Sequence, residues 1–312
     1  MESFKLYIDG QFDAGAATFT SLNPATAEPW ATIAEARSEQ TDRAVQAAAR
    51  AFESDAWRGL TAGARGKLLL KLADLIERDA AKLARLETLD TGKIIRETQA
   101  QIAYVAEYYR FYAGLADKMD GSTLSIDKAD METWIKREPV GVVAAIIPWN
   151  SQLFLSAVKI GPAIAAGCTV VVKAAEVAPT PLLAFAELVH EAGFPAGVIN
   201  VITGFAEGCG TVLTQHAQVD HIAFTGGADT ARHIIRNSAE NLASTSLELG
   251  GKSPFIVFAD ADLESAANAQ VAAIFSASGQ SCVAGSRLLV DEQIKDAFIE
   301  KLTSKVRGIV IG

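Results

Sequence analysis

Apolar and polar positions follow two kinds of spacing along the chain, one typical of strands and the other of helices. The first twenty residues predict two short strands around a turn at Asp9-Gly10, and Asn23-Pro24-Ala25-Thr26 marks a second turn. Apolar residues at helical spacing then predict three helices, near residues 39–54, 61–86 and 93–116.

Residues 119–139 show a different pattern, in which apolar and polar residues alternate. Leu124, Ile126 and Ile135 belong to this alternation, which runs on both sides of the polar stretch 127–130. The segment therefore predicts a β-hairpin that is polar on one face.

From residue 140 onward, short and nearly all-apolar strands alternate with helices. The predicted strands cover residues 142–147, 169–172, 198–202, 221–224, 245–249, 255–258 and 288–290. Such a pattern indicates an α/β fold whose parallel sheet is covered on both faces. Right-handed crossovers make the sheet doubly wound, with ligands expected at the carboxyl ends of its strands.

Composition narrows the function classes. Half of the 312 residues are hydrophobic and the mean hydropathy is +0.20, which excludes a disordered chain. The net charge of −9 argues against nucleic-acid and anionic-membrane partners. With no visible secretory signal, no apolar run long enough to cross a bilayer and only three cysteines, we expect a reducing, cytoplasmic compartment. The four histidines have no metal-ligand spacing, so no metal site is expected.

Cys282 is the candidate nucleophile. It lies in Gly279-Gln280-Ser281-Cys282-Val283-Ala284-Gly285, where small residues allow a substrate carbonyl to approach the sulfur closely. A thiolate is a strong nucleophile when its pKa is lowered or a base assists it. The alternative is a small buried hydrophobic residue, but the surrounding glycines and serines favour a loop.

Glu248 is the candidate general base. It ends an apolar strand, between Leu247 and Leu249, and desolvation of its carboxylate there would suit base chemistry near neutral pH. The alternative is an exposed glutamate paired with Lys252, and the residues alone leave both interpretations open.

Asn150 follows another apolar strand, within Pro148-Trp149-Asn150. Its amide could donate a hydrogen bond to a developing oxyanion. The alternative, which spacing alone favours, is an N-cap for the next helix.

The chain has no Gly-x-Gly-x-x-Gly fingerprint, but two other stretches suit a nucleotide. Phe224-Thr225-Gly226-Gly227 lies at a strand-to-helix junction, where two glycines let a helix N-terminus face a phosphate. Lys173 and Glu176 flank another strand end, where ribose hydroxyls could be held.

Together these motifs resemble the NAD(P)-dependent aldehyde dehydrogenase superfamily. The matching stretches, in the family's order and spacing, are Pro148-Trp149-Asn150, Ala166-Gly167-Cys168 through Lys173 and Glu176, Phe224-Thr225-Gly226-Gly227, Leu247-Glu248-Leu249-Gly250-Gly251-Lys252-Ser253-Pro254 and Gly279-Gln280-Ser281-Cys282. The resemblance covers essentially the whole chain. Two departures are Ala174, where the family usually has proline, and the absence of the family's later Glu-x-Phe-Gly-Pro segment.

The resemblance implies an NAD-dependent oxidation of a small aldehyde to a carboxylic acid. Cys282 would attack the carbonyl, Asn150 and the Cys282 amide would form the oxyanion hole, and Glu248 would activate water against the thioester. The implied catalytic set is Cys282, Glu248, Asn150 and Lys173. The implied cofactor set is Ile147, Trp149, Lys173, Glu176, Gly208, Phe224, Thr225, Gly226, Gly227 and Leu249. Because the Glu176 carboxylate would repel a 2′-phosphate, NAD is expected over NADP.

The resemblance also implies a domain plan. Residues 1–118 and 140–248 would form an atypical Rossmann-like NAD-binding domain, and residues 119–139 an oligomerisation hairpin. Residues 249–312 would begin an incomplete α/β catalytic domain, since family chains run about half as long again. A full-length protein is expected to be a homodimer or homotetramer, and the 312-residue chain is expected to be a truncated form.

Two alternatives to this function remain. In one, coenzyme A rather than water resolves the thioester, although Glu248 suits hydrolysis better. In the other, the chain is an inactive truncated product or a scaffold that binds NAD.

Overall fold

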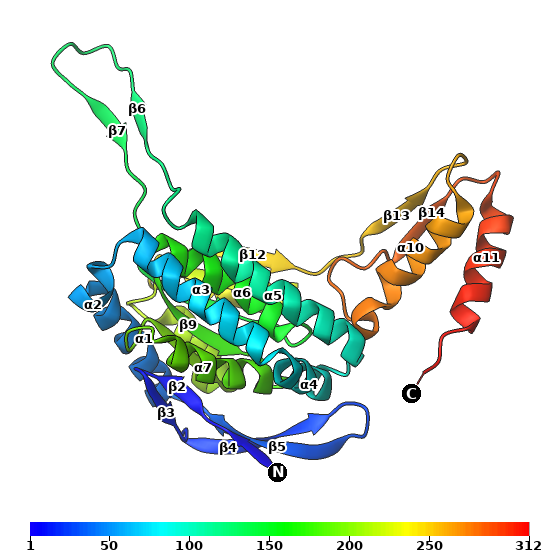
Figure 1. Cartoon of the computed structure of the whole chain (residues 1–312), viewed down its shortest axis with the longest axis horizontal. Helices are drawn as coiled ribbons and strands as arrows, with labels where there is room; N and C mark the ends of the chain where they lie inside the picture. The colour runs from blue at the N-terminus through cyan, green and yellow to red at the C-terminus, as the bar shows by residue number, and fades with distance from the viewer. Residues whose placement is uncertain (312) are drawn as a thin grey trace.

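A seven-stranded sheet organises most of the molecule (Figure 1), which a computed structural model describes over residues 1–311. Its strands, in spatial order, are β12 (Ser244–Leu249), β11 (His221–Gly226), β8 (Val142–Ile146), β9 (Thr169–Ala174), β10 (Ile199–Thr203), β2 (Leu6–Ile8) and β3 (Gln11–Asp13). The first five run parallel, and β2 and β3 are antiparallel additions at one edge. The predicted α/β fold with a doubly wound parallel sheet is therefore confirmed.

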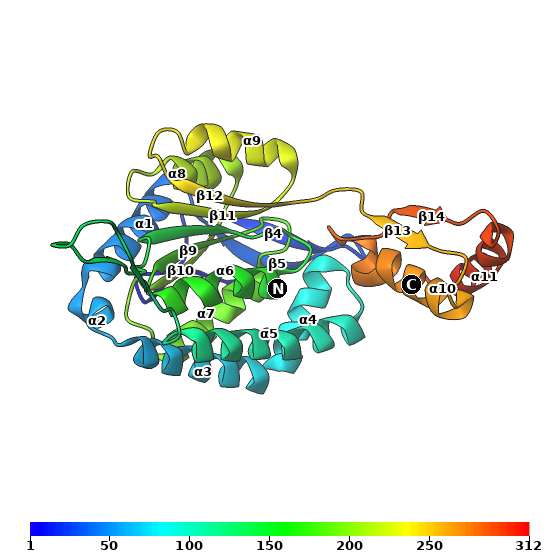
Figure 2. The same cartoon turned by 90° about the horizontal axis from the view of Figure 1, so that it is seen from above.

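Helices cover both faces of this sheet (Figure 2). One face carries α1 (Ser38–Glu53), α8 (Thr211–Gln215) and α9 (Ala228–Asn237), and the short helix α2 (Asp55–Arg58) follows α1. The other face carries α6 (Gln152–Ala166) and α7 (Thr180–Ala192), with α3 (Ala62–Arg78), α4 (Ala80–Thr91) and α5 (Ile95–Leu115) packed outside them. Every residue of β8, β9 and β10 is buried, as expected for parallel strands covered on both sides.

The first hundred residues differ from the expectation in two ways, a strand that was not predicted and a predicted helix that is broken. A separate sheet of β1 (Glu2–Phe4), β5 (Glu28–Glu35) and β4 (Ala17–Asn23) includes a strand, β5, that the sequence did not predict. The single helix expected over 61–86 is broken at Asp79, whose φ of −98° and ψ of 15° separate α3 from α4. The predicted turn at Asp9-Gly10 is present, and both residues have positive φ.

The predicted hairpin protrudes from the rest of the molecule (Figure 1). Its ladder pairs β6 (Ser122–Leu124) with β7 (Thr133–Ile135) in antiparallel register. The apolar side chains of Leu124, Met131 and Trp134 are all exposed. Exposed apolar residues on a projecting hairpin are typical of a surface that another chain covers.

Beyond β12, an extended segment leads to a second, smaller unit (Figure 1). This small lobe (residues 254–307) pairs β13 (Pro254–Val257) with β14 (Arg287–Val290) in parallel and packs α10 (Leu263–Phe275) and α11 (Lys295–Arg307) against them. The rest of the chain without the hairpin, residues 1–118 and 140–249, is called the body below. Within residues 1–311, no helix has both the length and the apolar character needed to cross a membrane.

Candidate active site

The candidate site lies where five neighbouring parallel strands end. From β8 the chain adds β9 and β10 on one side, then returns to add β11 and β12 on the other. In such a sheet the ligand crevice lies at the carboxyl ends of the strands, where the strand order reverses. The predicted residues at these ends are Ile147, Trp149 and Asn150 for β8, Lys173 and Glu176 for β9, Gly208 for β10, Phe224, Thr225, Gly226 and Gly227 for β11, and Glu248 and Leu249 for β12.

A cavity of about 610 Å³ brings many of these residues to the loop of Cys282. The predicted residues that line it are Trp149, Asn150, Thr225, Gly226, Gly227, Glu248, Leu249 and Cys282. The others, Ile147, Lys173, Glu176, Gly208 and Phe224, lie outside its lining. The cavity thus joins the predicted nucleophile, base and oxyanion donor to the glycine turn.

Cys282 lies in a turn between η2 (Ser276–Gly279) and β14, and it is exposed. The alternative of a small buried hydrophobic residue is therefore wrong. Cys168 and Cys209 are both buried, and burial raises the pKa of each thiol. Of the three cysteines, only Cys282 combines accessibility with a place in the cavity.

The loop before Cys282 has a strained backbone that the body holds in place. Ala277, Ser278 and Gly279 have φ values of +54°, +55° and +74°, a left-handed conformation that costs non-glycine residues about 1–3 kcal/mol each. The Ala277 amide donates to Glu97 Oε2 at 2.8 Å, and the Ser278 hydroxyl donates to the Gly92 carbonyl at 2.9 Å. These hydrogen bonds attach the nucleophile loop to the segment around the start of α5.

Asn150 is the second link between the body and this loop. Its Nδ2 donates to the Gln280 carbonyl at 2.6 Å, and Gln280 Nε2 donates to the Thr91 carbonyl at 3.1 Å. The N-cap of α6 is Ser151, so the interpretation of Asn150 as the helix cap is wrong. The Asn150 amide instead contacts Gln280, which precedes Cys282 by two positions in the chain.

Glu248 differs from expectation in its surroundings. It is exposed at the end of β12, an edge strand, so the desolvation predicted from Leu247 and Leu249 does not occur. No ion pair to Lys252 forms within residues 1–311 either. An exposed carboxylate beside the cavity is open to water, which a general base for hydrolysis must reach.

Lys159 is a residue that the sequence analysis missed. It is buried in α6 and its Nζ donates to Thr225 Oγ1 at 2.6 Å. Burial lowers the pKa of Lys159 to about 8, although the negative charge of Glu248 acts in the opposite direction. Its sequence signal is a single charged residue in the helical run 153–160, whose other members are apolar except for Ser156.

Lys173 and Glu176 form an ion pair of 2.7 Å at the end of β9. Burial by itself would raise the pKa of Glu176, but the charge and hydrogen bond of Lys173 lower it overall. The Ile147 amide donates to the Lys173 carbonyl at 3.0 Å, which joins the ends of β8 and β9. An ionised carboxylate at this edge can accept hydrogen bonds from ribose hydroxyls.

The glycine turn after β11 leaves room for a phosphate. A Cβ on Gly226 would lie 2.4 Å from the Phe224 ring, whereas a Cβ on Gly227 would meet nothing within 4 Å. Helix α9 begins at Ala228, directly after this open position, and the first amides of a helix have no partner within it. At Gly208, in η1 (Ala206–Gly210), a side chain would make only ordinary contacts, so crowding does not require glycine there.

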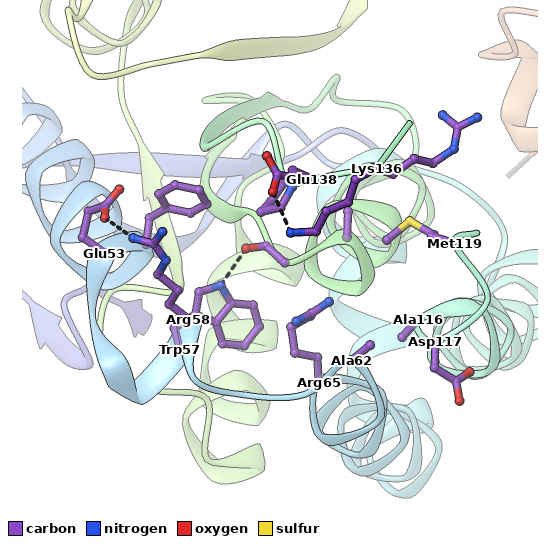
Figure 3. A pocket seen from close by; sticks show the side chains of 15 residues that line it. Glu53, Trp57, Arg58, Ala62, Arg65, Ala116, Asp117, Met119, Lys136 and Glu138 are labelled. Carbon is purple, nitrogen blue, oxygen red and sulfur yellow. Dashed lines mark hydrogen bonds and ion pairs between the residues drawn. The ribbon is translucent and has the colours of Figure 1, made fainter. Parts of the chain in front are cut away.

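A second cavity, of about 690 Å³, lies at the foot of the hairpin (Figure 3). Two ion pairs lie among its lining residues, Arg58 with Glu53 at 2.9 Å and Lys136 with Glu138 at 2.8 Å. The Trp57 indole donates to a backbone carbonyl at 2.9 Å. None of the predicted site residues lines this cavity. Within residues 1–311, no cluster of three or more His, Cys, Asp or Glu side chains is placed to hold a metal ion.

Comparisons with known proteins agree on one family. The model of the aldehyde dehydrogenase family matches residues 12–312. A curated relative from Acinetobacter baylyi, named (Z)-2-((N-methylformamido)methylene)-5-hydroxybutyrolactone dehydrogenase, is 68% identical over all of this chain and 64% of its own length. The betaine aldehyde dehydrogenase of Bacillus subtilis is 43% identical over 98% of this chain and 63% of its own length.

Solved structures give the same result. An NAD+ complex of an aldehyde dehydrogenase from Bacillus cereus matches with a TM-score of 0.97 at 43% identity, over 100% of this chain and 64% of that one. A betaine aldehyde dehydrogenase from Staphylococcus aureus, also with NAD+, has a TM-score of 0.96 at 42% identity, over 100% of this chain and 62% of that one. The chain therefore spans less than two thirds of the length of these proteins.

Proposed function

The chain belongs to the aldehyde dehydrogenase family, and from this membership we propose that it supplies the cofactor site and the nucleophile for the oxidation of an aldehyde to a carboxylic acid with NAD+. The observation that carries the proposal is the single cavity that joins Cys282, Asn150 and Glu248 to the turn at Gly226-Gly227. A nucleophile, an amide donor, a carboxylate and an open helix N-terminus are the parts that this reaction needs.

Cys282 begins the proposed reaction. Its sulfur attacks the carbonyl carbon of the aldehyde, and the carbonyl oxygen takes up the electron pair of the broken π bond. The amide of Asn150 and the backbone N–H of Cys282 donate hydrogen bonds to that oxygen. Asn150 is suited to this role because its contact with the Gln280 carbonyl keeps its side chain beside the nucleophile loop. Bound NAD+ supplies the acceptor for the hydride that leaves this carbon.

Glu248 acts on the thioester that then remains on Cys282. Its carboxylate takes a proton from water, the hydroxide oxygen attacks the acyl carbon, and the carbon–sulfur bond breaks to release the acid and the thiolate. Exposure of Glu248 gives it access to water, and the buried ammonium of Lys159 lies close enough for the two charges to interact.

The cofactor is held, in this proposal, by the strand ends on the body. Gly226, Gly227 and the first amides of α9 take the pyrophosphate, and Lys173 with Glu176 takes the adenosine ribose. NAD is preferred over NADP because the Glu176 carboxylate repels a 2′-phosphate. At ~4 Å and an effective dielectric of ~20, two like charges cost about 4 kcal/mol before screening. Even a third of that corresponds to about tenfold in affinity.

The Glu176→Ser variant tests this cofactor preference. Removal of the carboxylate should narrow the ratio of KM for NADP+ to KM for NAD+ by about tenfold, with Glu207→Ser as a control at a nearby exposed glutamate. A wild-type protein with the lower KM for NADP+ would contradict the assignment of Glu176.

The printed names of the relatives suggest test substrates. In a 5-hydroxybutyrolactone, ring carbon 5 bears both the hydroxyl and the ring oxygen, so it has the oxidation level of an aldehyde. Opening of the ring gives an aldehyde and a carboxylate in one molecule, and the proposed chemistry of Cys282 applies to that open form. We propose that the substrate of this chain is an aldehyde of this kind or a simpler one.

We further propose the domain plan that the resemblance implies. Residues 1–118 and 140–248 form the NAD-binding domain, residues 249–312 belong to the catalytic domain, and the hairpin at 119–139 mediates assembly into a homodimer or homotetramer. The exposed apolar side chains of Trp134 and Met131 support the hairpin assignment, since association would remove them from water.

The proposed function is tested in a polypeptide of the relatives' full length that contains this chain, called the full-length form below. With NAD+ and a panel of aldehydes it should form NADH, and Cys282→Ala should reduce the rate at least ~10⁴-fold because no covalent intermediate can form. Cys168→Ala, a buried cysteine outside the cavity, is the matched control and should keep most of the rate. Normal turnover in the Cys282 variant would end the proposal, and turnover that requires coenzyme A would replace it with acyl transfer.

A further inference from the structure

A buried polar cluster lies beside Asn150 and has no role in the reaction described above. At its centre, Lys93 Nζ lies 2.5 Å from Glu87 Oε1, 2.6 Å from Gln101 Oε1 and 3.2 Å from Ser151 Oγ. The side chains of Lys93 and Glu87 are 2% and 0% exposed. These four residues, from α4, α5 and the connections beside them, are called the Lys93 cluster below.

The hydrogen bonds of this cluster have a fixed polarity. A lysine ammonium has three donors and no acceptor, so Lys93 donates to all three of its partners. The oxygen of Gln101 is thereby engaged, and its amide nitrogen donates to Ser151 Oγ at 3.4 Å. Ser151 Oγ then accepts from both Lys93 and Gln101. Its own proton has no acceptor among residues 1–311, and Gln101 keeps a second N–H.

The cluster therefore offers only donors to whatever lies next to it. Glu87 balances the charge of Lys93 at 2.5 Å, so the cluster can bind a neighbouring group by hydrogen bonds but carries no net charge to attract it. The two hydrogen bonds that Ser151 Oγ accepts polarise its hydroxyl and strengthen it as a donor. Ser151 is 8% exposed and Gln101 is half-buried, so both are more accessible than Lys93 and Glu87 at the centre of the cluster.

The position of these donors relates them to the reacting carbonyl. Ser151 directly follows Asn150, the proposed oxyanion donor, at the start of α6. Gln280 connects the Asn150 amide to the Thr91 carbonyl, two residues before Lys93. The nucleophile loop and the Lys93 cluster thus meet on the same part of the body.

We propose that Ser151 and Gln101 determine substrate specificity by donating hydrogen bonds to an oxygen that the aldehyde carries a few bonds from its carbonyl carbon. This inference rests on the proposed function. The substrate class is an aldehyde with a carboxylate or ester-type oxygen. A hydrocarbon aldehyde would leave both donors without partners when it displaced water from them, and a site built to hydrogen-bond a substrate group discriminates against analogues that lack it.

Three aldehydes of similar length test this inference in the full-length form. 4-Oxobutanoate carries a carboxylate, its methyl ester carries a neutral acceptor, and butanal carries neither. The ratio of kcat/KM for 4-oxobutanoate to that for butanal should fall about tenfold in Ser151→Ala, because one hydrogen bond to a charged acceptor is lost. Ser151→Thr keeps the hydroxyl and should restore most of the ratio. If the ratio of kcat/KM for the methyl ester to that for butanal falls equally in Ser151→Ala, a neutral oxygen is sufficient for recognition. If that ratio falls less, the group that Ser151 recognises is the carboxylate.

Ser156→Ala is the matched control, since Ser156 lies on the same helix and its hydroxyl donates to the Leu153 carbonyl at 2.8 Å. It should leave the ratio unchanged. An unchanged ratio in both Ser151→Ala and Gln101→Leu would overturn the inference.

A binding measurement separates this inference from the proposed function. If the full-length form oxidises none of the three aldehydes and none of the wider panel, the proposed function fails. Calorimetry with succinamate, which has an amide in place of the aldehyde, still decides the role of Ser151. The Kd should rise about tenfold in Ser151→Ala, and equal affinities for the two proteins would contradict the inference.

Discussion

The body and the small lobe use the same kind of parallel strand with very different burial. In the body, one continuous core includes the central strands of the sheet and the inner sides of the helices on both of its faces. In the small lobe, the buried apolar residues are Val257, Ala267 and Phe298, while Phe258 and Leu289 remain 68% and 53% exposed. The cofactor side of the site is therefore organised by a packed core, whereas the nucleophile belongs to a unit that has little core of its own.

The difference explains how Cys282 is positioned. Its loop is placed by hydrogen bonds to the body, from Ala277 to Glu97 and from Asn150 to Gln280, rather than by packing within the lobe. Local opening of a region with few buried apolar contacts costs much less free energy than opening of a large core. The nucleophile side should thus be the more mobile half of the site.

Alkylation of the three cysteines is expected to show the largest contrast between the two regions. In the native 312-residue chain, iodoacetamide should modify Cys282 about a thousandfold faster than Cys168 or Cys209, because the two buried thiols react only after the core opens. Peptide mass spectrometry after timed quenching measures the three rates. In urea the three rates should converge, and similar rates under native conditions would contradict the contrast.

Hydrogen exchange is expected to show a smaller contrast across the backbone. Amides in α10 and α11 should exchange about a hundredfold faster than amides in α6 and α7, since only a few buried residues stabilise the lobe. Exchange followed by mass spectrometry on the 312-residue chain tests this. Equal protection of the two pairs of helices would show that the lobe is as stable as the body.

Burial also explains which strands of the body could be predicted from the sequence. The strands β8, β9 and β10 were predicted because a buried parallel strand needs an apolar run, which is a local signal. The strand β5 was missed because Pro29, Ala31 and Ala34 interrupt the strand-favouring residues Trp30, Thr32 and Ile33 and weaken the local signal. Its pairing with β1 and β4 is not visible in the local sequence.

Among the site residues too, those marked by a local motif could be predicted, whereas those that depend on tertiary packing could not. Motif spacing led to Cys282 and Asn150, whose places near the cavity depend on strand and loop order. The exposure of Glu248 could not be predicted, because it depends on β12 being an edge strand. The contact of Lys159 with Thr225 joins residues 66 positions apart, and such pairings arise only from tertiary packing.

The smallest expected effect is a pH dependence of the free energy of unfolding that comes from Lys159, on the body side of the site. Its pKa of about 8 lies below the ordinary value of 10.5, so the unfolded chain binds more protons than the folded one between these pH values. Burial of the charged Lys159 therefore lowers the free energy of unfolding by its full amount below pH 8, and by less as the pH rises above 8. Relative to Lys159→Met, the wild-type chain should gain about 2 kcal/mol in free energy of unfolding between about pH 7 and pH 9.5.

Urea denaturation of the wild-type and Lys159→Met chains at the two pH values measures this difference. Lys67→Met, at an exposed lysine of α3, is the control and should show no such dependence on pH. A constant difference between wild type and Lys159→Met would mean that Lys159 titrates normally in the folded protein.

The central claim is that Cys282 and Glu248 act one after the other on the same acyl group. Rapid quenching of the Glu248→Gln full-length form, mixed with NAD+ and aldehyde, tests this most directly. We expect a burst of NADH close to one equivalent per site, an acyl group on the Cys282 peptide by mass spectrometry, and little steady turnover. Steady turnover at the wild-type rate, or a burst with no acyl group on Cys282, would contradict it.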